Sequence, residues 1–220
     1  MSIQLIYSAL ISAGMTPEGA CGLMGNMQAE SAMRSNNVED RSGISDADYT
    51  ARVDNDPNYD FANDGGRHYG YGLCQWTLAS RKSALLAYAR SKGRSIGDEE
   101  MQVHFCIKEM QTDFPEVWKL LVSSHDLYEC TSLVCAVYEN PAVKNTDVRY
   151  GFAKKFYDEL ADQVAMPGTP PKGNPKDWDW KIALIQFCMQ TDGYWGEVDG
   201  VKSGEFIKCL EEYVKDIKIS

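Results

Sequence analysis

The chain has 220 residues, of which 44% are hydrophobic and 11% aromatic, and this content is sufficient for a packed core. Its formal net charge of −10 excludes nucleic acid as a partner class, because binding to phosphates needs a basic face. No apolar run approaches the ~20 residues that span a bilayer, so we expect no membrane insertion.

The first residues, MSIQLI, lack the basic start and continuous apolar segment of a secretory signal. We therefore expect synthesis and folding in the cytoplasm, with no signal peptide. A substrate outside the membrane would then require another component for delivery.

Seven cysteines form an odd set without Cys-x-x-Cys pairs, and three histidines are scattered along the chain without a metal-binding spacing. Unpaired or buried thiols in a reducing compartment are favoured over disulfides. No metal and no cofactor are expected.

The first predicted helices are marked by their caps. Residues 3–11 have apolar positions in helical phase and end near Gly14. Thr16 supplies a capping hydroxyl for the next helix, which is predicted to reach about Ser31. Small residues line one side of this helix. They favour either close helix packing or space for a bound chain beside Glu30.

The remaining chain to about Val164 is predicted to be a loop followed by helices. Residues 33–68 are polar and rich in turn formers, as in a functional or mobile loop. Helical patterns then begin at Arg81, at Asp98, at Asp126 and at Asn145 or Thr146.

Residues 166–175 contain four prolines and two glycines and are predicted to be a linker. The predicted organisation is therefore a first domain over 1–165, this linker, and a small helical module over 176–220. A module of about 45 residues is small for an autonomous domain.

Three motifs occur in order along the first domain. Residues 25–31 read GNMQAES, residues 69–77 read YGYGLCQWT, and residues 138–141 read YENP. Together they resemble the goose-type lysozyme and lytic transglycosylase superfamily, and most closely its phage peptidoglycan hydrolases, which include endolysins and tail lysozymes. The resemblance implies an α+β, mainly helical fold: a lysozyme-like domain with a small β-hairpin, followed by the helical C-terminal module.

Glu30 is the expected catalytic acid. Cleavage of a glycosidic bond needs a proton donor for the leaving oxygen. A carboxyl near a helix C-terminus and among apolar neighbours favours the protonated form that such a donor requires. The alternative is an ordinary solvated glutamate at a helix end.

The resemblance implies a second acid that holds the attacking water, and it places this role on Asp64. A turn-forming role for Asp64 stays open. Asp60, Asp56 and Asp40 are alternatives for the second acid.

The resemblance also implies substrate contacts by Ser31, Tyr71, Gln75, Trp76 and Tyr138. Burial is a competing interpretation for Trp76. Glu139 is expected to be structural, either orienting a loop or pairing with Arg149.

In the C-terminal module, residues 193–200 are similar to a turn of small peptidoglycan-binding domains. Tyr194, Trp195 and Asp199 are the predicted wall-binding residues. A helical hairpin that packs on the first domain, or forms a dimer, is the alternative.

The expected function is that of a muramidase, a phage endolysin that cuts the β-1,4 bond between N-acetylmuramic acid and N-acetylglucosamine in peptidoglycan glycan strands. A lytic transglycosylase of the same fold, and a non-catalytic wall-binding or tail structural protein, are the alternatives. The missing signal implies a holin for release to the cell wall.

Overall fold

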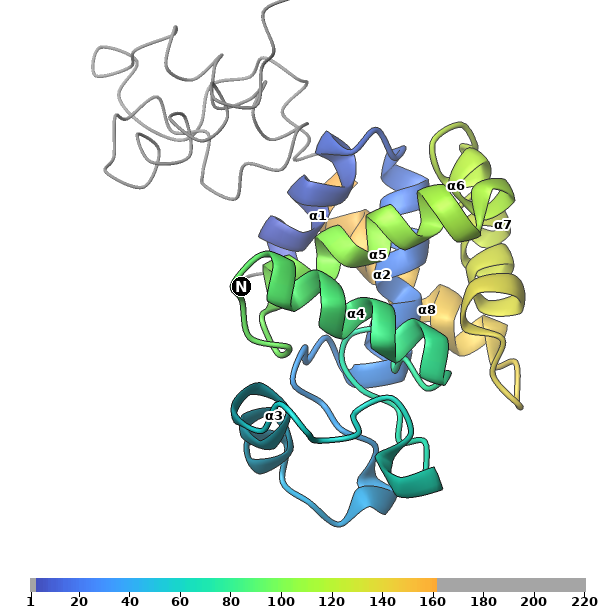
Figure 1. Cartoon of the computed structure of the whole chain (residues 1–220). Helices are drawn as coiled ribbons and strands as arrows, with labels where there is room; N and C mark the ends of the chain where they lie inside the picture. The colour runs from blue at the N-terminus through green and yellow to red at the C-terminus, as the bar shows by residue number, and fades with distance from the viewer. Residues whose placement is uncertain (1–2, 162–220) are drawn as a thin grey trace, which may run out of the picture. The chain divides into compact units, whose positions relative to one another are not determined.

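The computed structural model describes residues 3–161, which form a bundle of α-helices with one irregular lobe (Figure 1). The α-helices are α1 (Ile3–Ser12), α2 (Pro17–Ser31), α3 (Asp46–Asn55), α4 (Ala79–Ser91), α5 (Glu99–Asp113), α6 (Pro115–Leu121), α7 (Leu127–Leu133) and α8 (Thr146–Leu160). Short 3-10 turns lie at Asp40–Ser42 (η1) and Asp64–Gly66 (η2), and a π-helical turn, η3, spans Val134–Glu139.

Helix α2 is the central element, and its small residues permit close packing against three other helices. A Cβ atom at Gly19 would lie 2.0 Å from the carbonyl oxygen of Leu121 in α6, and one at Gly22 would lie 2.9 Å from Cβ of Cys130 in α7. A Cβ atom at Gly25 would lie 2.6 Å from the carbonyl oxygen of Arg149 in α8. The packing interpretation of this helix is therefore confirmed.

The N-terminal end of α2 is capped as the sequence indicates. The Thr16 hydroxyl accepts a hydrogen bond from the backbone N–H of Gly19 at 3.0 Å, and Pro17 occupies the first turn. At the other end, Ala32 adopts the left-handed conformation, with φ of 53°. The helix therefore stops directly after Glu30 and Ser31.

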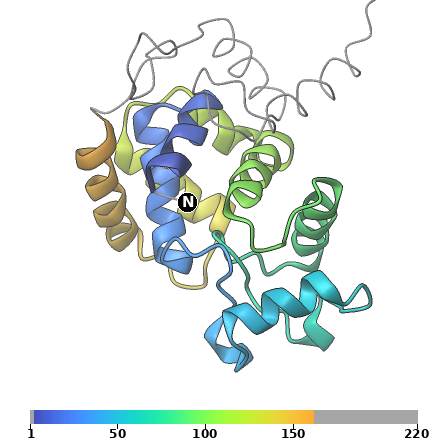
Figure 2. The ribbon, with the colours of Figure 1, turned by 90° about the vertical axis from the view of Figure 1, so that its left-hand side faces the viewer.

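The predicted loop 33–68 contains a helix that the sequence pattern did not reveal. Helix α3 begins after Ser45, whose side chain accepts a hydrogen bond from the N–H of Asp48. It buries only Tyr49 and Val53, so it has too few apolar positions for a clear helical period. Figures 1 and 2 show this segment as a lobe at one end of the bundle, near the C-terminal end of α2.

The predicted β-hairpin is not found, since the described part of the chain contains isolated β-bridges and no strand. Tyr71 pairs with Trp76 through two backbone hydrogen bonds, of 3.2 and 2.9 Å, and forms a second bridge with Val38. Only four residues separate Tyr71 from Trp76, and α4 begins at Ala79. The chain thus turns and enters a helix before a second pair can form.

Two other expectations can be compared with residues 3–161. The five cysteines in this range are free and buried, as predicted (Cys21, Cys74, Cys106, Cys130 and Cys135). Within the same range, no helix combines the length and apolarity needed to cross a membrane. The linker 166–175 and the module 176–220 lie outside the described residues and stay predictions.

Candidate active site

Glu30 lies at the C-terminal end of α2 and keeps limited access to solvent. Its side chain is 18% exposed. The carboxylate Oε1 accepts a hydrogen bond of 2.6 Å from Nη2 of Arg149 in α8, whose side chain is 7% exposed. The carboxyl group is therefore oriented by a buried cation while part of the side chain stays open.

Asn26 completes this arrangement one helical turn before Glu30. Its Oδ1 accepts a hydrogen bond of 3.1 Å from Nη1 of Arg149, so both side chains on this face of α2 bind one guanidinium group. The Asn26 amide donates in turn to the carbonyl oxygens of Gly22 and Thr131. The shared contact with Arg149 is a physical reason for the spacing of Asn26 and Glu30 in the sequence motif.

Ser31 connects the end of α2 to the downstream turn. The buried Ser31 hydroxyl lies 3.0 Å from the carbonyl oxygen of Leu73 and 3.1 Å from that of Met27. The first contact joins the GNMQAES segment to the YGYGLCQWT segment, so the structure brings the two motifs together. Ser31 itself presents little surface to a substrate.

The turn at residues 72–75 is held by two side-chain amides, that of the buried Gln102 and that of the partly exposed Gln75. Gly72 has φ of 78°, and a Cβ atom there would lie 2.5 Å from Oε1 of Gln102. That same Oε1 accepts a hydrogen bond from the N–H of Leu73 at 2.9 Å. The Gln75 amide donates to the carbonyl oxygens of Asn37 and Gly72, both at 3.1 Å. Gln75 stays partly exposed, and what it can offer a substrate is its carbonyl oxygen.

Three predicted substrate contacts are buried in the core. Tyr71, Trp76 and Tyr138 are at most 1% exposed. The Tyr71 hydroxyl lies 2.6 Å from the Thr50 hydroxyl, whereas the polar groups of Trp76 and Tyr138 both donate to Oε2 of Glu109, at 3.0 and 2.7 Å. In this structure none of the three rings presents a surface to a glycan, because each places its polar atom on an internal partner.

Glu109 is an internal anchor that the sequence reasoning did not identify. It lies on α5 and accepts two hydrogen bonds from the Arg81 guanidinium, at 2.7 and 2.8 Å. Arg81 also donates to the carbonyl oxygen of Tyr138 and lies over the Tyr138 ring at 4.5 Å. This cluster fixes η3, and with it Glu139, to α4 and α5.

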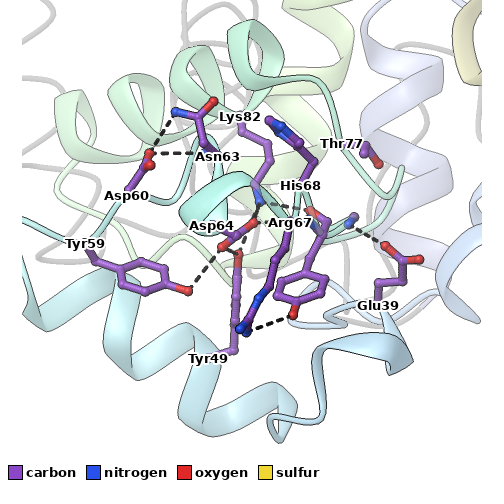
Figure 3. Close-up of polar contacts among 12 residues, drawn as sticks. Glu39, Tyr49, Tyr59, Asp60, Asn63, Asp64, Arg67, His68, Thr77 and Lys82 are labelled. Atoms are coloured by element: carbon purple, nitrogen blue, oxygen red, sulfur yellow. Dashed lines mark hydrogen bonds and ion pairs between the residues drawn. The ribbon is translucent and has the colours of Figure 1, made fainter.

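Asp64, the predicted second acid, lies in a closed polar network (Figure 3). Its side chain is 1% exposed and is paired with Lys82, which is 0% exposed. The carboxylate accepts hydrogen bonds from Lys82 Nζ at 2.5 Å, Tyr49 Oη at 2.6 Å, Tyr59 Oη at 3.1 Å and the Tyr69 N–H at 3.2 Å. With these partners in place, Asp64 has no surface for an attacking water in this structure.

Burial and the neighbouring carboxylate act in opposite directions on the pKa of Lys82 in this network. Burial lowers the pKa of the Lys82 ammonium, and the Asp64 carboxylate acts in the opposite direction.

The three alternatives for the second acid, Asp40, Asp56 and Asp60, are exposed. Asp60 accepts two hydrogen bonds from Asn63, and Asp56 accepts one from the Asn58 N–H, as in ordinary turns.

Glu139 is a second acid near Glu30. The residue is partly exposed, but its Oε1 is buried without a hydrogen-bond partner. Burial, followed by the nearby Glu30 carboxylate, raises the pKa of Glu139 well above its usual range. The ion pair of Arg149 is made with Glu30 and not, as one sequence interpretation held, with Glu139.

Two further observations limit what the candidate site can contain. No group of acidic, histidine or cysteine side chains within residues 3–161 has the arrangement of a metal site. A pocket of about 290 Å³ is lined by residues that include Val53, Leu86, Arg90 and Ile96, but by none of the predicted site residues. The predicted wall-binding residues, Tyr194, Trp195 and Asp199, lie outside the described part of the chain.

A mainly helical domain with Glu30 at the end of its central helix, joined through Ser31 to a glycine-containing turn, defines a lysozyme-like protein. The family model of the phage tail lysozymes matches residues 2–160, and the chain belongs to this family. It is therefore a phage lysozyme-type enzyme that acts on peptidoglycan. The resemblance on which the sequence analysis relied is confirmed.

Proposed function

We propose that the protein is a muramidase that cleaves the β-1,4 bond between N-acetylmuramic acid and N-acetylglucosamine, with Glu30 as the general acid. The observation that carries this proposal is the position of Glu30 at the end of α2, where its carboxyl group is oriented by the buried Arg149 while its side chain stays 18% exposed. A proton donor must be both positioned and accessible to the bond it protonates.

The chemistry follows from these contacts. Glu30 gives its proton to the glycosidic oxygen as the bond to the sugar carbon breaks. The carboxylate that remains is stabilised by the guanidinium of Arg149, which Asn26 holds in place. Water then adds to the sugar carbon and gives one proton back to the Glu30 carboxylate, which completes hydrolysis. If a hydroxyl of the substrate attacks instead, the product is an anhydro sugar and the enzyme is a lytic transglycosylase.

We assign Asp64 a structural role in this proposal. Its oxygens are occupied by Lys82, two tyrosines and a backbone N–H, which together hold η2 against α3 and α4. Gln75 is the predicted substrate contact that keeps exposure near the turn. The turn itself is bound to the end of α2 through Ser31.

Mass spectrometry of digested peptidoglycan tests the proposal. Reducing N-acetylmuramic acid ends are expected for a muramidase, and anhydro-muramic ends would identify a transglycosylase. Free N-acetylglucosamine reducing ends or cleaved stem peptides would contradict both. Binding to walls without any cleavage would favour the non-catalytic alternative.

We further propose that the protein is made in the host cytoplasm and acts on the cell wall. The family match to phage tail lysozymes favours attachment to the phage tail over free release as an endolysin through a holin. Detection of the protein in purified virions would support the tail role. Its absence from virions, with lysis that depends on a holin, would support the endolysin role.

A further inference from the structure

Cys74 and Cys106 form a pair of buried thiols that the proposed mechanism does not use. Cys74 belongs to the turn at residues 72–75 and Cys106 to α5, and the two residues are 2% and 0% exposed. Their Sγ atoms lie 3.8 Å apart, although the residues are 32 positions apart in the chain. A disulfide has about 2.05 Å between its sulfur atoms, so an approach of about 1.8 Å would join them.

The residues on both sides of this thiol pair are already bound to α5. The N–H of Leu73 donates a hydrogen bond of 2.9 Å to Oε1 of Gln102. The indole N–H of Trp76 donates a hydrogen bond of 3.0 Å to Oε2 of Glu109. Positions 102, 106 and 109 lie on one face of α5, because side chains three and four residues apart are neighbours on a helix. The thiol pair lies between the two hydrogen bonds in both segments, so these bonds hold its sulfur atoms close together.

A disulfide would not disturb the polar contacts around the thiol pair. The Tyr138 hydroxyl lies 3.3 Å from Sγ of Cys106, but it also donates to Oε2 of Glu109 at the shorter distance of 2.7 Å. Burial raises the pKa of the Cys74 thiol, so this group is neutral, as a disulfide is. Oxidation therefore changes no charge and leaves the Tyr138 hydroxyl with its carboxylate partner.

We propose that Cys74 and Cys106 are a redox modification site, reduced in the cytoplasm and joined as a disulfide in the oxidising surroundings of the cell wall. The co-reactant is a low-molecular-weight disulfide. One cysteine attacks it, forms a mixed disulfide and releases the first small thiol, and the second cysteine then displaces the second small thiol. The two cysteine protons end on the two released thiols, and the external disulfide takes up the two electrons. The change of compartment rests on the proposed function, whereas the geometry of the pair does not.

The cross-link would fix the turn at residues 72–75 to α5 by a covalent bond. The same turn binds the end of α2, because the carbonyl oxygen of Leu73 accepts a hydrogen bond of 3.0 Å from the Ser31 hydroxyl. The cross-link thus supports the segment that contacts the residue next to Glu30. Because both thiols are buried, exchange requires local opening of the turn and is slow in the folded protein.

Mass spectrometry of the full-length protein tests the modification. The protein is incubated with oxidised and reduced glutathione, both in the folded state and during refolding from urea, and free thiols are then blocked with N-ethylmaleimide. A fragment pair joined through Cys74 and Cys106 is expected, and it should form faster during refolding. Cys21→Ala, which replaces a buried cysteine of α2, keeps this cross-link, whereas Cys74→Ala loses it. Unlinked Cys74 and Cys106 in both samples, or a disulfide from either to another cysteine, would overturn the proposal.

Thermal unfolding measures the effect of the cross-link. The oxidised wild type should melt about 5 °C or more above the same protein in dithiothreitol, because the closed loop restricts the unfolded chain. This comparison does not depend on the folding of a variant. An equal or lower melting temperature of the cross-linked wild type would overturn the proposal. If the wild type cleaves no glycan, the proposed function fails, whereas the cross-link and the melting temperatures still report on Cys74 and Cys106.

Discussion

Glu30 and Asp64 are both carboxylates paired with a buried cation, yet the two surroundings differ in one decisive respect. Glu30 is bound by Arg149 alone and keeps 18% of its side chain exposed. Asp64 is 1% exposed, and four donors surround it. The second network can position the chain but cannot reach a substrate.

The comparison shows that pairing with a cation does not by itself identify a catalytic acid. A catalytic acid must also keep part of its side chain exposed, so that a substrate can reach it. At Asp64 every oxygen has a partner, as a stable buried ion pair requires. Near Glu30, the Glu139 carboxyl has a buried oxygen without a hydrogen-bond partner. This oxygen destabilises the folded state, whereas the Asp64 network has no such group.

The Asp64→Asn variant gives the largest expected change in stability. It leaves the buried Lys82 ammonium without its counter-charge, and breaking such a pair costs about 3–5 kcal/mol. Urea unfolding measures this loss, with the exposed Asp60→Asn as control. The double variant Asp64→Asn with Lys82→Met should be less destabilised than Asp64→Asn. An Asp64→Asn protein that is as stable as the wild type but inactive would contradict the structural role.

The Gly25→Ala variant tests the other region through the packing of α2 on α8. The added Cβ atom would meet the Arg149 carbonyl oxygen at 2.6 Å, so a loss of about 1–3 kcal/mol in unfolding free energy is expected. The rate of cleavage should fall as well, because Arg149 orients Glu30. Gly151→Ala in α8 is the matched control, since a Cβ atom there meets nothing within 4 Å. Equal behaviour of the two variants would show that α2 and α8 can separate without cost.

The Thr16→Ala variant has the smallest expected effect and acts at the end of α2 far from Glu30. Loss of the cap should cost about 1 kcal/mol, because the Gly19 N–H loses its acceptor. Thr16→Ser retains the hydroxyl and should restore most of this loss. Cleavage by the folded protein should not change in either variant. A large loss of activity at unchanged stability would show that the two ends of α2 are coupled.

The sequence predicted those features of the fold that local signals encode. The start of α2 follows from Thr16 and Pro17, and the helix ends at Ser31, the expected residue. Helix α3 was missed because only two of its residues are buried. The hairpin was expected from the resemblance, but the chain between Tyr71 and α4 is too short for paired strands.

The site was less predictable because its contacts are distant in sequence. Glu30 could be named from its motif, whereas its partner Arg149 lies 119 residues away. The sequence motifs do not indicate which polar atom each aromatic side chain will contact. Trp76 and Tyr138 are buried because Glu109 accepts their hydrogen bonds, and nothing in the segments around Trp76 or Tyr138 indicates Glu109.

The Glu30→Gln variant tests the central claim most directly. The substitution removes the proton donor with little change in volume, and general acid catalysis contributes about 10²–10⁴-fold to a rate. Release of muropeptides from purified peptidoglycan, normalised to folded protein, should therefore fall by at least about 100-fold while thermal unfolding still shows a folded protein. Cleavage by Glu30→Gln at a rate close to that of the wild type would contradict the assignment of Glu30 as the catalytic acid.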